Sequence, residues 1–139
     1  MNRKLSREVA YRVIYSHGFS NEGQSKNLSE AIETAKEGIK EQLDLKYIKI
    51  LIDATTANLE QIDTLIAGSL RGFSFERLFP TDLSALRLGL AEMRFIQPNG
   101  PDQDPVPAEV IIDAVVTLAK KYGTEKSAGF VNGVLASVR

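Results

Sequence analysis

Apolar residues spaced three and four positions apart are the feature that most constrains this chain. The spacing is plain at the C-terminal end, where Val131, Val134, Leu135 and Val138 occupy positions i, i+3, i+4 and i+7. Such a stripe forms one face of an α-helix, and no rhythm of alternating strands and helices appears elsewhere. The sequence therefore predicts an all-α protein.

The length of the chain suits a single domain. With 139 residues, 43% of them hydrophobic, it can bury a real core over residues 1–139. We expect a helical bundle of about six or seven helices. The expected helices cover residues 6–17, 29–42, 45–67 with a break near Thr55 and Thr56, the stretch that follows Pro80, 113–122 and 125–138. The expected N-caps are polar residues whose side chains can accept from free backbone N–H groups: Ser6, Thr81, Asp113 and Thr124.

The helix after Pro80, the proline-rich segment and the apolar residues between helices each predict a further feature of the fold. The helix after Pro80 is predicted to be central, because its apolar residues recur at helical spacing through Leu83, Leu86, Leu90 and Met93. Residues 97–107 hold four of the five prolines and predict an exposed loop. Large apolar side chains between helices are predicted to fill the core: Phe73, Phe75 and Leu78.

Gly133 breaks a helix rule inside the strong C-terminal pattern. Glycine within a helix costs about 1 kcal/mol relative to alanine. Its presence predicts that something approaches this backbone closely, either another helix or a bound ligand. Gly123 is expected to end the preceding helix, after Lys120 and Lys121 in its last turn.

The composition argues against catalysis. The chain has no cysteine and a single histidine, His17, so cysteine-based and histidine-cluster metal sites are excluded. No glycine-rich phosphate loop is present, and the surface acids mark no catalytic pair. We expect a non-enzymatic protein without a cofactor. No run of about 18 apolar residues and no signal peptide appear, so we expect a cytoplasmic protein without a membrane segment.

The first predicted helix carries a mixed basic and aromatic stripe. Lys4, Arg7, Tyr11 and Tyr15 fall within one sector, and Glu8 is the single acid in this basic end of a chain with net charge -1. Cations beside aromatic rings suit single-stranded RNA, because the cations neutralise phosphates while the rings or guanidinium planes stack on bases. Packing of both tyrosines against a neighbouring helix explains the same spacing. On spacing alone, packing is slightly favoured.

The C-terminal region offers the same choice. Phe130 suits the core beside Val134, although an edge position on a binding surface is the alternative. Lys120, Lys121 and Lys126 add positive charge around Gly123, for which a solvated surface is the ordinary interpretation.

Three sequence blocks resemble the NusB family of bacterial transcription antitermination factors, over nearly the whole chain. The first runs from Arg7-Glu8 through Ile14-Tyr15-Ser16, and the second from Asp82 through Ala85-Leu86-Arg87 to Glu92-Met93. The third and most specific joins Ala119-Lys120-Lys121-Tyr122-Gly123 to Phe130-Val131-Asn132-Gly133-Val134-Leu135.

The resemblance implies a small, non-catalytic RNA-binding protein. Such a protein would pair with the ribosomal protein NusE, hold the boxA element of nascent rRNA as a single strand and act in the RNA polymerase antitermination complex. By similarity, the RNA would meet Arg3, Lys4, Arg7 and Tyr15, with Phe130 beside that surface, and Asp82 would contact NusE. This implication reverses the slight preference for packing on the first helix. It also makes Gly133 one wall of a site whose other wall carries Lys4, Arg7 and Tyr15.

Some positions depart from the family pattern. Lys126 stands where an acidic residue is familiar, so it would attract phosphate instead, and we include it among the RNA-binding residues. Asp113 and Ala114 replace the usual Asn and Glu. The 97–107 loop is also longer and richer in proline than the family pattern implies, which leaves its role open.

Two other functions fit the same resemblance less well. An accessory domain of an rRNA cytosine methyltransferase would need a catalytic domain and a cysteine nucleophile, and the chain has neither. A helical protein-interaction module without an RNA role, such as a homodimer that uses the tyrosine face, is the third alternative.

Overall fold

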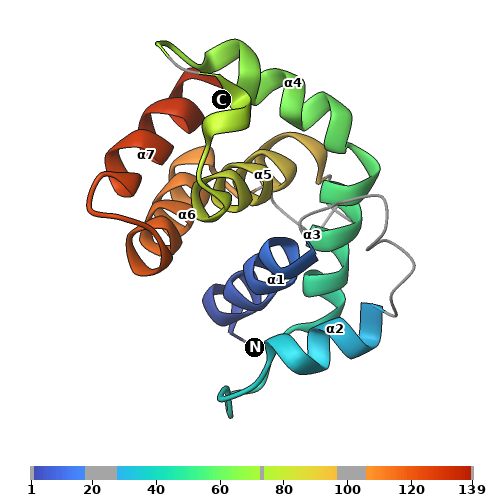
Figure 1. Ribbon diagram of the computed structural model, residues 1–139. Helices are drawn as coiled ribbons and strands as arrows, with labels where there is room; N and C mark the ends of the chain where they lie inside the picture. Colours follow the sequence, from blue (N-terminus) through green and yellow to red (C-terminus); the bar gives the residue numbers. More distant parts are fainter. Residues whose placement is uncertain (1, 18–27, 73, 97–105, 139) are drawn as a thin grey trace.

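The protein is a bundle of α-helices over the residues that the computed structural model describes, which are 2–17, 28–72, 74–96 and 106–138 (Figure 1). The all-α prediction is confirmed, and these residues contain no strand. The elements in chain order are α1 (Arg3–His17), α2 (Leu28–Ala35), α3 (Leu45–Ala57), α4 (Leu59–Ser69), a short 3-10 helix η1 (Phe75–Arg77), α5 (Pro80–Phe95), α6 (Ala108–Tyr122) and α7 (Ser127–Val138).

Helix α5 forms the centre of the bundle, as its sequence pattern predicts. It packs against α1, α3, α4, α6 and α7, and Figure 1 shows it among them. Leu86, Leu88 and Leu90 are all fully buried although they point in different directions around the helix. A helix that is buried on every side must have neighbours on every side. The termini of α5 are therefore its only exposed parts.

The N-terminus of α1 differs from the prediction. Ser6 is not the N-cap, because the helix begins at Arg3 and the Asn2 side chain accepts a hydrogen bond from the Leu5 N–H at 2.9 Å. Ser6 is instead buried one turn later. Its hydroxyl donates to the Asn2 carbonyl at 2.7 Å and accepts from the Asp44 N–H at 2.9 Å, so it joins α1 to the start of α3.

Other helix boundaries also differ. Asp113 is not an N-cap, since α6 begins five residues earlier at Ala108, and Asp113 lies exposed within the helix. Helix α2 ends at Ala35 rather than near Gln42, and Gly38 follows in the left-handed conformation with φ of 86°. The long third pattern is broken as expected, with the break at Asn58.

Two of the three large apolar residues that were predicted to fill the core lie in the described part of the chain. Phe75 and Leu78 are partly buried and pack against the core. Phe73, most of the predicted loop (97–105) and the side chain of His17 lie outside the described residues. No helix of the described part is long and apolar enough to cross a membrane.

The close approach predicted at Gly133 occurs at other glycines. A methyl group on Gly133 would meet nothing within 4 Å, so of the two explanations for this glycine the structure does not show the close approach of another helix. On Gly123, the same methyl would lie 2.7 Å from the Ala119 carbonyl oxygen, and on Gly89 it would lie 3.0 Å from Leu135. Gly123 has a φ of -99°, so it is required for its small size and not for a left-handed turn.

Gly133→Ala is therefore expected to stabilise the protein by about 0.5–1 kcal/mol, because alanine loses less backbone entropy in a helix. Urea unfolding would measure the change. Gly89→Ala is the matched control, since its methyl would press on Leu135 and cancel the same gain. A Gly133→Ala variant less stable than the parent chain would contradict the open surroundings of Gly133.

Candidate nucleic-acid interface

Helix α1 exposes its two ends and buries its middle. Arg3 and Lys4 are exposed at one end and Tyr15, 47% accessible, at the other, whereas residues 6–11 are all buried. Eleven residues of helix separate Lys4 from Tyr15 by roughly 17 Å. The prediction of one continuous exposed stripe through Arg7 and Tyr11 was therefore wrong, because neighbouring helices cover the centre of α1 on this side as well.

Arg7 lies in the core and is paired there. It is 6% exposed, and its guanidinium donates to both carboxylate oxygens of Glu92 on α5, at 2.7 and 2.8 Å. The Tyr47 hydroxyl of α3 donates to the same carboxylate. Burial and the neighbouring Glu92 charge raise the pKa of Tyr47, which keeps its hydroxyl protonated. These three side chains tie α1, α3 and α5 together.

Tyr11 is also a packing residue. Its ring lies 5.1 Å from the Tyr122 ring of α6 at an interplanar angle of 30°, and its hydroxyl donates to the Thr81 carbonyl at 2.9 Å. Burial and the nearby Asp82 carboxylate raise its pKa. The packing alternative thus holds for Tyr11, whereas Tyr15, one turn further on, keeps an accessible ring.

Arg3 stacks on an aromatic ring at the N-terminal end of α1. Its guanidinium carbon lies 3.7 Å from the centre of the Tyr47 ring, and one terminal nitrogen is 3.9 Å from the Asp44 carboxylate. Stacking holds a guanidinium plane while its N–H edges stay available to other acceptors. The arrangement leaves the Arg3 side chain 45% accessible.

Glu8 is the acceptor of a second buried network. Its carboxylate accepts from the Lys121 ammonium at 2.6 Å, from the Tyr122 hydroxyl and from Arg12 at 3.5 Å. Burial alone would raise the pKa of Glu8, but the hydrogen bonds from Lys121 and Tyr122 outweigh burial and lower it. The same contact raises the pKa of Lys121. This network joins α1 to the C-terminal end of α6.

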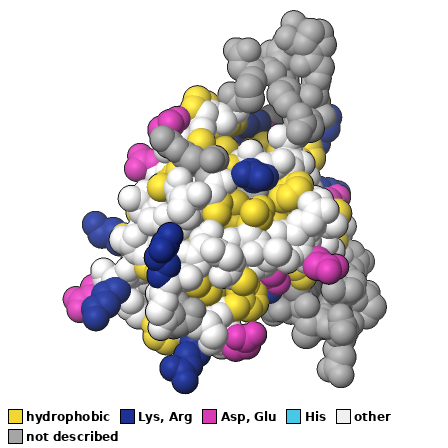
Figure 2. Space-filling model, turned by 90° about the horizontal axis from the view of Figure 1, so that it is seen from above, with side chains coloured by type: hydrophobic (Ala, Val, Ile, Leu, Met, Phe, Trp, Pro, Cys, Tyr) yellow, Lys and Arg dark blue, Asp and Glu magenta, His cyan; other side chains and the backbone are white. Residues whose placement is uncertain are grey.

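A groove of about 550 Å³ follows α1 and α6 beside these networks. Lys4 and Lys121 line it, and Leu5 and Leu118 supply apolar surface. Its two acids are Asp113 and Glu8, the latter paired with Lys121. The face seen from above in Figure 2 is different in kind. There, hydrophobic side chains gather near the middle and both signs of charge are scattered, with no broad basic field. The α1–α6 side thus offers the better surface for a polyanion.

The C-terminal candidates lie at the turn into α7 and on α7 itself. Lys126 is exposed in the turn, and its backbone N–H donates to the Thr124 hydroxyl at 3.3 Å. Phe130 is partly buried and packs against the core, as its default interpretation predicts. Helix α1, which carries Tyr15, and helix α7, which carries Phe130, both pack on α5. Their juxtaposition around an RNA strand stays a prediction.

Asp82 occupies the first turn of α5 and is buried. One of its carboxylate oxygens, Oδ1, has no hydrogen-bond partner among the described residues. A carboxylate near a helix N-terminus is favoured by the helix dipole, but an unpaired buried oxygen is uncommon. Its contact with a partner protein stays a prediction.

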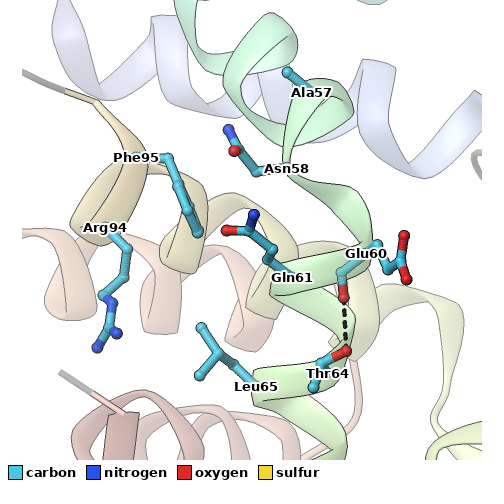
Figure 3. Close-up of a pocket in the computed structure, with 8 residues that line it drawn as sticks. All are labelled: Ala57, Asn58, Glu60, Gln61, Thr64, Leu65, Arg94 and Phe95. Atoms are coloured by element: carbon cyan, nitrogen blue, oxygen red, sulfur yellow. Dashed lines mark hydrogen bonds between the residues drawn. The ribbon is translucent and has the colours of Figure 1, made fainter.

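A second hollow lies at the opposite end of α5, with a volume of about 760 Å³ (Figure 3). Gln61 and Leu65 of α4 face Arg94 and Phe95 of α5 across it, and Arg94 donates to the Val138 carbonyl at 2.8 Å. It shares no lining residue with the α1–α6 groove. In the described part of the chain, no group of acidic and histidine side chains could hold a metal ion.

Sequence reasoning missed the two buried carboxylates that organise α1. Glu8 stood out only as the lone acid in a basic segment, and Glu92 sits in the otherwise apolar stretch of α5. An acid within a fully buried helix signals a paired cation, because an unpaired buried charge is too costly. That signal, applied to Glu92, would have indicated that an Arg or Lys of another helix is buried too.

Comparisons with known proteins agree with this architecture. The NusB family matches residues 4–139. The transcription antitermination protein NusB of Clostridium botulinum (strain Kyoto / Type A2) is 38% identical over 149 aligned positions, which cover 99% of both chains.

Solved structures match over the same length. T. maritima NusB superposes with a TM-score of 0.78 at 30% identity, covering 99% of this chain and 90% of that one. A crystal structure of antitermination factors NusB and NusE in complex with dsRNA matches with a TM-score of 0.75 at 31% identity, covering 98% and 94%. With a family match over almost its entire length and relatives this similar, the chain belongs to the NusB family.

Proposed function

We propose that this protein is an RNA-binding transcription antitermination factor that binds boxA RNA of nascent rRNA together with ribosomal protein NusE. The observation that carries the proposal is the full-length likeness to the NusB chain solved with NusE and dsRNA. The protein acts as an adaptor for the RNA polymerase antitermination complex and catalyses no reaction. Its place of action is the cytoplasm, where transcripts are made.

The RNA contacts are assigned to exposed cations and accessible rings. Arg3 and Lys4 neutralise phosphates at the N-terminal end of α1, and Lys126 does so at the turn before α7. Tyr15 and the accessible part of Phe130 stack on bases. Arg7 supports this surface from below, because its guanidinium is committed to Glu92.

Asp82 is assigned to the NusE contact. The assignment rests on its place at the start of the second block that resembles the NusB family, because its unpaired Oδ1 is buried and is not an atom that a partner would reach. A carboxylate repels phosphate, so this end of α5 suits a protein partner better than an RNA backbone.

Binding to a labelled boxA strand, with a scrambled strand as control, tests the proposal. Fluorescence anisotropy with and without NusE should show tighter binding by the two proteins together than by either alone. The affinity should fall with salt by roughly 0.7 log unit per log unit for each phosphate neutralised. Equal affinity for both strands, or an affinity that salt does not change, would exclude the proposed interface. A stable dimer that never binds RNA would favour the protein-interaction alternative.

A further inference from the structure

Burial of Arg7 leaves a gap in the cationic path along α1. Lys4 lies at one end of the helix and Tyr15 at the other. Of the two cations between them, Arg7 is buried, and the 30% exposed Arg12 already donates to Tyr122, to Glu8 and to two backbone carbonyls. A strand that runs past both ends would cross roughly 17 Å of helix, a length that holds several phosphates. The middle of this path needs a cation from another element.

Lys121 of α6 occupies that position. Its ammonium nitrogen is 2.6 Å from the carboxylate of Glu8, which lies one turn after Lys4 and two turns before Tyr15 on α1. The Lys121 side chain remains 57% exposed, and it lines the α1–α6 groove together with Lys4. The Tyr122 ring, 5.4 Å from the same nitrogen, limits its movement on another side.

The local charge balance favours an anion. The groups that face Glu8 are Lys121, Arg12 and the Tyr122 hydroxyl, so this cluster holds two cations against one carboxylate. Asp113, the other acid of the groove, lies about two turns before Lys121 on α6. The ammonium carries three N–H donors, of which the contact with Glu8 uses one. A phosphate can therefore bind Lys121 without breaking its bond to Glu8.

We propose that Lys121 supplies the phosphate contact at the middle of the RNA path, and that Glu8 is the positioning residue that holds it there. This inference rests on the proposed function, because it takes the bound polyanion to be RNA. It transfers to α6 the role that the sequence stripe gave to Arg7.

Lys121→Gln tests the proposal, with Lys120→Gln as the matched control. Both changes remove one exposed charge from the same turn of α6, but Lys120 is not among the residues that line the groove. At 0.1 M salt, loss of one phosphate contact with a slope of 0.7 should weaken boxA binding about fivefold and reduce the salt slope by about 0.7. Lys120→Gln should change neither the affinity nor the salt slope. Lys121→Arg, which keeps the charge, should bind about as tightly as the parent chain.

A double-mutant cycle tests the positioning role of Glu8. In a Glu8→Gln background, the loss caused by Lys121→Gln should shrink, whereas a purely structural Glu8 would leave that loss unchanged. Circular dichroism spectra and melting temperatures identify any variant that fails to fold. Equal effects of Lys121→Gln and Lys120→Gln would overturn the inference. A parent chain that does not bind RNA would instead overturn the proposed function.

Discussion

Glu92→Ala should lower the free energy of unfolding by about 3–5 kcal/mol, because it leaves a buried guanidinium without its counter-charge. Arg7 is 6% exposed and donates two hydrogen bonds to Glu92, and Tyr47 donates a third. The substitution also opens a space in α5, the helix on which most of the bundle packs. Urea unfolding followed by far-ultraviolet circular dichroism would measure the loss.

The double variant Arg7→Met, Glu92→Leu is the control for this interpretation. It removes both charges and fills the space with apolar atoms, so much of the lost stability should return. A loss below about 1 kcal/mol in Glu92→Ala would mean that the pair is solvated. A double variant that is as unstable as the single one would show that shape, and not the unpaired charge, sets the cost.

The periodicity of the sequence was sufficient for the fold class and for the central helix. Leu86 and Leu90 recur at helical spacing, and α5 proves to be the element that the others surround. Helix ends were harder, because Ser6 and Asp113 are the residue types that cap helices but lie within α1 and α6. Capping depends on where the backbone leaves the helix, which composition alone does not specify.

The candidate site was less predictable for a physical reason. Spacing on a helix reveals which side chains share a sector, but not whether a second element covers that sector. Arg7 and Tyr15 are two full four-residue steps apart on α1, yet one is in the core and the other is exposed. Glu92, which pairs with Arg7, and Lys121, which pairs with Glu8, are 85 and 113 positions away from these α1 residues in the sequence. Only the tertiary structure brings them together.

Residues that stabilise the fold and residues proposed to bind RNA therefore alternate along α1. Arg7 and Glu8 are neighbours in sequence, but each is held by a different network, one to α5 and one to α6. Charge loss at Arg7 would impair RNA binding through unfolding, whereas charge loss at Lys4 would impair it directly. A variant that weakens binding therefore identifies a contact residue only when its stability is measured as well.

Tyr15→Ala meets that requirement and is expected to cause the largest direct loss of RNA affinity. A stacked base contributes about 1–3 kcal/mol, which corresponds to a decrease of about 5- to 150-fold in affinity for a boxA strand. The ring is 47% exposed, so unfolding by urea should change little. Anisotropy titrations would measure the affinity, and the salt slope should stay the same, because no charge is removed.

Tyr15→Phe separates stacking from hydrogen bonding at this position. The phenylalanine ring presents the same π-face, so its affinity should stay close to that of the parent chain if stacking is the interaction. A loss as large in Tyr15→Phe as in Tyr15→Ala would assign the contact to the hydroxyl. Unchanged binding in Tyr15→Ala would remove this end of α1 from the RNA path. The path would then have to leave α1 near Glu8, and Lys4 and Lys121 would have to supply its contacts along the α1–α6 groove.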